Sequence, residues 1–303
     1  MKLTRRDIGK LAAAAIPGVG FFAASQAWAQ RAARPNSKVA GVQIGLNVPY
    51  NFGGRDMETN ELLDRIVKLN VNAVEMRSQP VESFLGSPAA NGQKADTEVM
   101  RQWRAKVSMD RAGAFRKKFE DAGVLIEIVK YDGIYDMADA EVDYCFNLAR
   151  TLGARALSCE IDVKHTQRIG QFADKHKLMV AYHGHATTTP EHWESAFKQA
   201  RYNGANLDIG HFVAGNNISP VPFLKQHYAR ITHVHVKDRK MKEGPNTPFG
   251  EGDTPIVEVL RLIRDNKWPI QATIEFEYPV PAGSDRMAEL AKTIDYCRKA
   301  LAS

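Results

Sequence analysis

The chain has 303 residues, of which 44% are hydrophobic and 25% charged, which is enough apolar side chain to build a large core. Residues 1–29 hold four basic side chains and one acidic one, so the formal net charge of +6 falls to +3 for the 274 residues that follow. So small a surplus argues against a nucleic-acid-binding protein. Cys145, Cys159 and Cys297 show no short paired spacing, which argues against a zinc knuckle or a disulfide framework and predicts buried thiols.

The first thirty residues, MKLTRRDIGKLAAAAIPGVGFFAASQAWAQ, predict a secretory signal at residues 1–29 that is cleaved after Ala29. The segment TRRDI at residues 4–8 resembles the twin-arginine signal, which directs already folded chains to export. A membrane anchor is the alternative, but the apolar run over residues 11–24 is interrupted by Pro17 and is short for a span. We therefore expect a periplasmic or secreted protein without a stable membrane anchor.

Beyond a leader at residues 30–38, eight β-rich segments alternate with segments whose apolar residues recur every three or four positions. The expected strands are residues 39–46, 72–76, 125–131, 155–161, 178–185, 205–211, 231–238 and 271–278. The expected helices are residues 60–69, 111–123, 141–153, 166–177, 191–204, 220–230, 255–266 and 287–301. Such alternation is typical of a parallel sheet with crossover helices.

Eight repeats in roughly 250 residues predict an α/β protein with a closed (β/α)₈ TIM barrel, as a single domain at residues 39–303. An open doubly wound sheet is the alternative, but no GxGxxG follows the first expected strand. The longest connection, residues 79–109, contains GSPAANGQ, which is too loose for a packed helix. We expect this connection to form a flap over the mouth of the barrel.

Ionisable residues gather where the strands are expected to end, which is the face at which such barrels hold their working site. They are Glu75, Glu160, His183, His185, Asp208, His211, His233, His235, Lys237, Asp238, Glu275 and Glu277. His233 and His235 are two apart on one strand, so they share a face. Unpaired charges are costly to bury, so the concentration predicts a divalent cation.

A glycine-rich segment, FGEGDTP at residues 249–255, precedes an expected helix as phosphate-binding loops do. Its Glu251 and Asp253 would repel a phosphate. We therefore interpret this segment as a helix cap and rim loop.

Five short motifs along the later strands carry a resemblance to a known family. They are SCEI at residues 158–161, YHGH at 182–185, LDIGH at 207–211, HVHVKD at 233–238 and IEFEY at 274–278. In this order they resemble the xylose-isomerase-like TIM barrels of the sugar phosphate isomerase/epimerase family, which include tagatose and psicose epimerases and inosose dehydratases. The resemblance extends from about Gly41 to Leu301.

The resemblance implies one divalent ion held by three carboxylates and one imidazole. The implied metal ligands are Glu160, Asp208, His235 and Glu275, with Glu277 as the alternative to Glu275. Oxygen-rich ligands of this kind suit Mn²⁺ best, with Mg²⁺, Co²⁺ or Zn²⁺ as alternatives. Where family members have a glutamate, this chain has His183, and Glu160 on the neighbouring strand is the expected replacement.

The same resemblance implies roles around the ion. The implied catalytic residues are Glu160, Glu275, His183 and Lys237, and the implied substrate-binding residues are His185, His211, Glu75 and Glu277. Structural interpretations remain open for some of them. Glu75 could instead pair with Arg77, Asp208 could cap a helix, and His233 could support His235. Asp238 is expected to be a loop residue behind the site.

The resemblance implies an enzyme that isomerises or epimerises a free keto-sugar by proton abstraction, through an enediolate held by the metal. The alternatives are a dehydratase or lyase acting by β-elimination on a keto-sugar, inosose or 3-keto-glycoside, and a non-catalytic sugar-binding barrel. An apurinic-site endonuclease shares the fold but fits a weakly basic exported chain poorly. We expect a small carbohydrate as the partner, and a homo-oligomer is left open.

Overall fold

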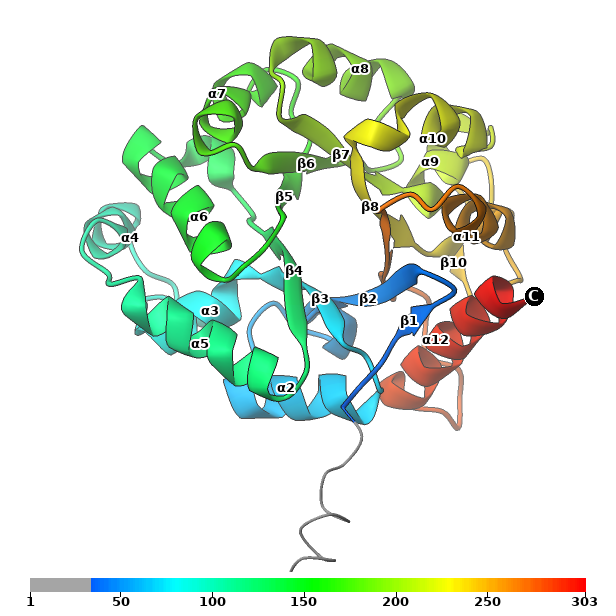
Figure 1. The fold of residues 1–303 in the computed structure, drawn as a ribbon, viewed down its shortest axis with the longest axis horizontal. Helices are drawn as coiled ribbons and strands as arrows, with labels where there is room; N and C mark the ends of the chain where they lie inside the picture. Colours follow the sequence, from blue (N-terminus) through cyan, green and yellow to red (C-terminus); the bar gives the residue numbers. More distant parts are fainter. Residues whose placement is uncertain (1–33) are drawn as a thin grey trace, which may run out of the picture. The chain divides into compact units, whose positions relative to one another are not determined.

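The computed structural model describes residues 34–303, so the predicted signal at residues 1–29 lies outside the described part of the chain. Eight parallel strands form a closed barrel, in the order β2, β11, β8, β7, β6, β5, β4 and β3, and β3 pairs with β2 to complete the ring (Figure 1). These strands are β2 (Val42–Val48), β3 (Ala73–Arg77), β4 (Leu125–Lys130), β5 (Ala156–Glu160), β6 (Met179–His183), β7 (Asn203–Asp208), β8 (Ile231–Val236) and β11 (Gln271–Ile274). The predicted (β/α)₈ barrel is confirmed.

The helices surround the strands as an outer ring (Figure 1). They are α2 (Thr59–Lys68), α3 (Ser78–Leu85), α4 (Thr97–Arg104), α5 (Asp110–Asp121), α6 (Asp139–Thr151), α7 (Thr166–His176), α8 (Pro190–Gln199), α9 (Ile209–Asn216), α10 (Val221–His227), α11 (Ile256–Asp265) and α12 (Arg286–Ala302). In α11 the spacing of Ile256, Val259, Leu260 and Ile263 puts four buried side chains on one stripe. Burying each contributes about 1.5–3 kcal/mol of hydrophobic stabilisation.

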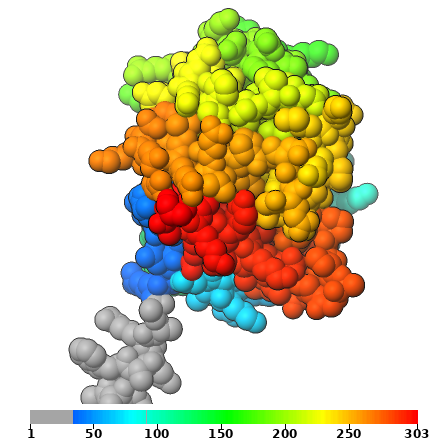
Figure 2. Space-filling model, turned by 90° about the vertical axis from the view of Figure 1, so that its right-hand side faces the viewer, coloured from blue at the N-terminus to red at the C-terminus, as the bar shows by residue number. Residues whose placement is uncertain are grey.

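Two short hairpins and four 3₁₀ turns complete the described residues. They are β1 (Lys38–Val39), which pairs antiparallel with β2, the β9 (Asp238–Arg239) and β10 (Asn246–Thr247) hairpin, and the turns η2 (Tyr50–Phe52), η3 (Ala90–Gly92), η4 (Ile134–Asp136) and η5 (Tyr228–Arg230). The last helix, α12, packs against β1 and β2, and Figure 2 shows its red surface beside the blue start of the barrel. No helix within residues 34–303 has the length and apolarity needed to cross a bilayer.

Side chains alternate between the two faces along most of the barrel strands, with register shifts between β3 and β4 and between β7 and β8. Val74 and Met76 of β3 join the apolar layer under the helices, whereas Glu75 between them contacts the β8 histidines across the barrel interior. The same alternation places the buried polar side chains of Ser158, Asn206 and Thr273 on the inner face. The interior of this barrel is therefore polar, whereas most such interiors are filled by Val, Ile and Leu.

The structure corrects several expected elements. The connection expected at residues 79–109 includes two helices that were not expected, α3 and α4, on either side of the loose segment GSPAANGQ. The strand expected to continue to residue 211 ends at Asp208, where α9 begins, and the helix expected to reach residue 204 ends at Gln199. The last strand ends at Ile274, so Glu275 and Glu277 follow it. The three cysteines are free and buried, as predicted.

Candidate metal centre

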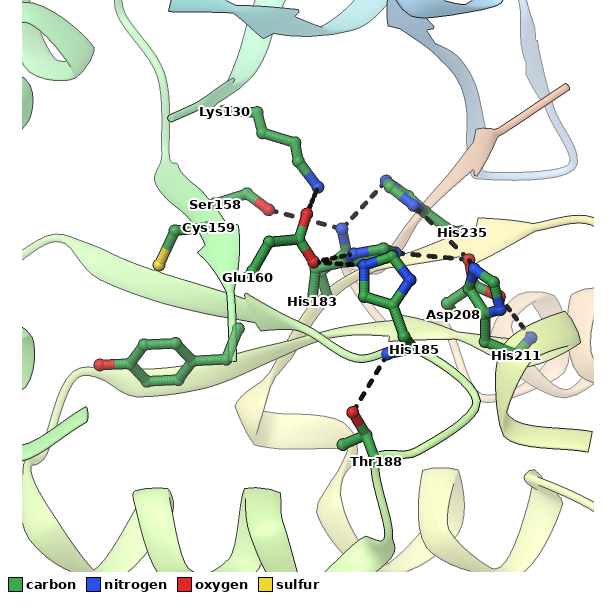
Figure 3. A network of polar contacts seen from close by, with 12 residues as sticks. Lys130, Ser158, Cys159, Glu160, His183, His185, Thr188, Asp208, His211 and His235 are labelled. Atoms are coloured by element: carbon green, nitrogen blue, oxygen red, sulfur yellow. Dashed lines mark hydrogen bonds and ion pairs between the residues drawn. The ribbon is translucent and has the colours of Figure 1, made fainter. Parts of the chain in front are cut away.

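Four side chains converge at the carboxyl ends of β6, β7, β8 and β11. We call His183, Asp208, His235 and Glu275 the quartet: one possible ligand atom of each lies within 4.8 Å of the others, and all four residues are buried. Strand register brings them together, since Asp208 lies opposite His235 in the ladder that joins β7 to β8. Figure 3 shows His183, Asp208 and His235 pointing toward one another.

Asp208 combines the two roles that its sequence position suggested. Its Oδ1 accepts a hydrogen bond from the backbone N–H of His211 at 2.7 Å and caps α9. Its Oδ2 faces the quartet, 3.4 Å from His183 Nε2. The cap therefore fixes the carboxylate with one oxygen directed into the site.

The ring of His183 is held from behind by a carboxylate. Its Nδ1 donates to Glu160 Oε2 at 2.8 Å, an arrangement that follows from the pairing of Glu160 with His183 between β5 and β6. Lys130 Nζ contacts the other oxygen of Glu160 at 2.8 Å (Figure 3). Burial acts to raise the pKa of Glu160, but His183 and Lys130 outweigh it and hold that pKa well below its ordinary value. Glu160 is thus ionised and leaves His183 Nε2 facing the quartet.

His235 is held in the same way by Glu75. His235 Nε2 donates to Glu75 Oε2 at 2.5 Å, which leaves Nδ1 facing Glu275 Oε2 at 3.2 Å. Although burial acts to lower the pKa of His235, the carboxylates of Glu275 and Glu75 raise it to about 10. His233 lies deeper, between Thr232 and the other oxygen of Glu75. Of the two histidines that share a face, only His235 joins the quartet.

A buried ammonium group lies beside the two carboxylates of the quartet. Lys237 Nζ lies 2.6 Å from Glu275 Oε2, 3.0 Å from Asp208 Oδ2 and 2.6 Å from Glu277 Oε2. Burial acts to lower the pKa of Lys237, but these carboxylates raise it above its ordinary value. Lys237 therefore carries a positive charge that offsets part of the negative charge of the site.

The atoms of the quartet fit a divalent cation. His235 Nδ1 is buried, has no hydrogen-bond partner in the described part of the chain and faces Glu275 Oε2, whose other close neighbour is the ammonium group of Lys237 at 2.6 Å. Histidine ligands of metals commonly donate their second ring N–H to a carboxylate, as His183 does to Glu160 and His235 to Glu75. Two imidazole nitrogens and two carboxylate oxygens are donors that first-row divalent metals accept.

Two further histidines lie beside the quartet, and their pKa values are shifted in opposite directions. The side chain of His185 is 56% exposed, and its Nε2 donates to Glu160 Oε2 at 2.7 Å, a bond that raises the pKa of His185. His211 lies between Lys237 Nζ and Arg239, at 3.1 and 2.7 Å. Burial lowers the pKa of His211 to about 4, so this ring is neutral at pH 7.

The structure brings together most of the residues that the sequence singled out, but it groups them differently from the expected ligand set. Asp208, His235 and Glu275 share the quartet with His183, whereas Glu160 groups with His183 and His185 beside it. Of the two interpretations left open for Glu75, the structure does not show the pairing with Arg77, since Arg77 Nη1 binds Asp132 at 2.6 Å and Glu75 contacts His235. Sequence reasoning missed Lys130 and Asn47, whose Nδ2 donates to Glu275 Oε1 at 2.9 Å.

The side chain of Asp238 binds the backbone of the glycine-rich segment at residues 249–255. Its carboxylate accepts backbone N–H groups of Gly250, Gly252 and Thr254 at 2.8, 2.9 and 3.2 Å. The amides that a phosphate would need are therefore already bonded. The interpretation of this segment as a loop that does not bind phosphate, with Asp238 behind the site, agrees with these contacts.

The carboxyl-terminal half of the chain matches a known family. Residues 158–300 match the family described as "Xylose isomerase-like TIM barrel", and this range contains the whole quartet. Two curated relatives from Clostridium botulinum, of strains Eklund 17B / Type B and Alaska E43 / Type E3, are each named "Inosose dehydratase". The chain is 27% identical to each over 133 residues, 36% of its own length, and the match spans less than half, 44%, of these relatives.

Solved structures share the barrel at low sequence identity. A xylose isomerase domain protein from Planctomyces limnophilus is 17% identical, with a TM-score of 0.61 over 88% of this chain and 99% of that one. D-psicose 3-epimerase from Clostridium cellulolyticum H10, solved with D-tagatose, is 11% identical, with a TM-score of 0.61 over 86% and 100%. The probable 3-DHS dehydratase from Bacillus anthracis is 13% identical, with a TM-score of 0.60 over 84% and 98%. These similarities establish the fold.

Proposed function

We propose that this protein is a divalent-metal-dependent sugar isomerase or epimerase that removes the proton beside the carbonyl of a free keto-sugar. The observation that carries the proposal is the buried quartet, in which each imidazole is held by a glutamate through one ring nitrogen and turns the other toward two carboxylates. Known members of the matched family are sugar-modifying enzymes, which supports a carbohydrate as the substrate.

His183, Asp208, His235 and Glu275 would hold the ion. When bound, a divalent cation supplies a Lewis acid that polarises the sugar carbonyl and makes the neighbouring C–H more acidic. Two nitrogen and two oxygen donors favour Mn²⁺, Co²⁺ or Zn²⁺ over Mg²⁺, which prefers an all-oxygen shell. This donor set differs from the one expected from the sequence, because His183 takes the place of Glu160.

The two sides of the quartet offer different proton carriers. On one side His185, backed by Glu160, is open to solvent and can accept or return a proton through its outer ring nitrogen. On the other side Glu275 is fixed by Asn47 and Lys237, and Lys237 lies where it can stabilise a negative substrate oxygen. Epimerisation needs one proton carrier on each face of the sugar, and Glu275 is our candidate opposite His185.

A dehydratase is the second candidate. The relatives matched over 133 residues are named inosose dehydratases, and elimination of water begins with the same proton abstraction. It also needs an acid to protonate the departing hydroxyl. His185, whose pKa the bond to Glu160 raises, is the residue that could supply this proton.

One experiment tests the shared first step. Purified protein is stripped with a chelator, loaded with Mn²⁺, Co²⁺ or Zn²⁺, and incubated in D₂O with a panel of ketoses and inososes. We expect one bound ion per chain and deuterium at the carbon beside the carbonyl, read by NMR. Mass spectrometry of a parallel reaction in H₂O then separates the two candidates, since elimination yields a product lighter by one water and epimerisation one of equal mass.

A matched pair of variants ties the result to the site. Asp208→Asn keeps an oxygen to cap α9 but removes the charge from the quartet, so we expect it to lose both the ion and the exchange. Asp295→Asn, on the exposed face of α12, should change neither. A protein that binds none of the three metals, or exchanges no proton with any of them bound, would contradict the proposed function.

A further inference from the structure

A polar cavity opens beside the quartet, at the carboxyl ends of β2 and β11. It has a volume of about 570 Å³, and its wall includes Tyr50, Arg55, Asn246, Glu277 and Arg286. A space of this size accommodates several atoms of a small ligand beyond those at a metal. Two arginines in one wall, on segments more than two hundred residues apart in the chain, suggest that the cavity binds a particular group.

Glu277 separates the cavity from the quartet, and its charge is already compensated. Its Oε2 contacts Lys237 Nζ at 2.6 Å, and its Oε1 accepts the hydroxyl of Tyr50 at 2.7 Å. Lys237 in turn contacts Glu275 of the quartet. A ligand in the cavity would therefore lie one side chain away from the candidate metal centre and would meet a neutralised carboxylate.

Arg286 is fixed in place without an acidic partner. Its Nη1 donates to the carbonyl of Asn51 at 3.3 Å, and its guanidinium lies over the Phe276 ring, 4.9 Å from the ring centre. Asn51 is itself bonded to the backbone of Ile274 and Phe276 on either side of the end of β11. No carboxylate of residues 34–303 forms an ion pair with Arg286. The remaining N–H groups of this guanidinium are thus preorganised for a ligand.

Arg55, from the loop after η2, adds a second poorly compensated charge. Its side chain is 69% exposed, and its one described carboxylate contact is Asp132 at 3.7 Å. Asp132 is already bound by Arg77 at 2.6 Å. Gly53 allows the loop to approach, since its φ of +95° is reached at low cost by glycine and its position faces Arg286.

The charges of the cavity wall favour an anion. Guanidinium groups bind carboxylate or phosphate through paired, charge-assisted hydrogen bonds, and these are stronger than bonds to a neutral hydroxyl. The glycine-rich segment at residues 249–255 offers no competing anion site, because Asp238 occupies its amides. We infer that this cavity is the subsite for an anionic group, carboxylate or phosphate, on the part of the substrate remote from the carbonyl, with Arg286 and Arg55 as specificity-determining residues.

This inference rests on the proposed function and narrows its substrate to an acidic keto-sugar. The test compares three probes that share one polyol chain: D-glucitol, D-gluconate and D-glucitol 6-phosphate. Calorimetric titration of the purified protein should show at least tenfold tighter binding of one anionic probe than of glucitol. The anionic probe that binds more tightly identifies the group as carboxylate or phosphate.

Variants test whether the preference for an anionic probe comes from the arginines of the cavity. Arg286→Gln should bring the affinities for the anionic probes and for glucitol to within about twofold of each other. Arg55→Gln, whose side chain is 69% exposed, should reduce the preference for the anionic probe severalfold. Arg201→Gln, on the exposed loop before β7, is the matched control and should keep it. Equal binding of all three probes, or no binding of any, overturns the inference, as does a preference that survives in both the Arg286 and Arg55 variants.

The outcomes for the two proposals are separable. Metal binding and deuterium exchange without an Arg286-dependent anion preference would leave the proposed function and remove the subsite. An Arg286-dependent preference in a protein that binds no metal and exchanges no proton would keep the subsite and remove the proposed function.

Discussion

The two histidines of the quartet owe their orientation to glutamates that do not belong to it. Glu160 and Glu75 are ionised acceptors, so each obliges its histidine to carry a proton on the nitrogen that faces away from the quartet. A carboxylate in this position also makes the imidazole a stronger metal ligand. The two glutamates should therefore control metal affinity without touching the ion.

Glu160→Gln distinguishes this positioning role from the ligand role that the sequence suggested. A glutamine can still accept the bond from His183 but lacks the charge, so we expect metal affinity to fall about 10–100-fold, with one ion still bound at saturation. His183→Gln should abolish stoichiometric binding, because it removes a ligand. Calorimetric titration with Mn²⁺ or Zn²⁺ measures both.

Glu191→Gln, on the exposed first turn of α8, is the control and should bind as the unchanged protein does. The opposite ranking, with stoichiometric binding lost in the Glu160 variant and kept in the His183 variant, would restore Glu160 as the ligand. Glu75→Gln should lower the metal affinity by a similar factor, because Glu75 supports His235 as Glu160 supports His183.

Sequence reasoning found three members of the quartet because strand position decides them. Asp208, His235 and Glu275 lie at the ends of neighbouring strands, and their types alone indicate a cation site. The sequence could not show which of Glu160 and His183 is the ligand and which supports it. The two residues are paired in register on neighbouring strands, and only the orientation of the side chains decides which one faces the quartet. The contact of Glu75 with His235 could not be predicted, because His235 lies on β8, across the barrel interior from β3.

At the scale of elements, Arg104 at the end of α4 connects helices in and beside the segment that was expected to be a flap over the barrel mouth. Its Nε lies 3.1 Å from Glu82 of α3 and its Nη1 lies 3.0 Å from Glu141 of α6, and only 11% of the side chain is exposed. Glu141 also accepts the backbone N–H of Ala138 and caps α6. One cation thus holds two carboxylates and three helices.

Arg104→Met should destabilise the protein by about 3–5 kcal/mol, because the largely buried Glu82 loses its ion-pair partner and Glu141 keeps only the longer contact with Arg101 at 3.4 Å. Urea denaturation at pH 7 measures this. Burial acts to raise the pKa of Glu141, but the bonds to Ala138 and Arg104 lower it on balance. Stability from this group is therefore present above the unfolded pKa, about 4.3, and is lost as pH falls through the folded pKa. The variant should show a shallower loss of stability below about pH 4.3.

Lys117→Met is the matched control for the charge. Lys117 pairs with Asp121 one turn along α5 with 72% of its side chain exposed, so its loss should cost less than about 0.5 kcal/mol. An Arg104 variant as stable as this control would show that α3 and α4 are held by apolar contacts alone.

Helices with strong apolar periodicity were predictable, and those without it were not. The helix α11 could be predicted from its sequence because its apolar residues form a single stripe. In α9, every residue from Ile209 to Ala214 is buried, so no polar face marks a helix and the segment resembles the end of a strand. α3 and α4 are eight residues each and flank a loose segment, which concealed them.

For the whole molecule, strand–helix alternation was enough to predict the barrel, whereas its closure depends on contacts that no local pattern contains. β11 pairs with β2 and β2 with β3, so the first and last thirds of the chain meet at one seam. The quartet lies on four consecutive strands of this ring, β6, β7, β8 and β11. A bound ion would therefore link half of the ring.

This linkage predicts that metal stabilises the barrel as a unit. An ion held only by the folded chain at a concentration 100-fold above its Kd adds about 2.7 kcal/mol. For a protein of this size each kcal/mol raises Tm by about 2–4 °C, so removing the ion should lower Tm by roughly 5–10 °C. Differential scanning calorimetry with and without chelator measures the shift. Asp208→Asn should melt alike in both conditions, because it has no ion to lose. A chelator effect of equal size in that variant would mean that the ion binds elsewhere.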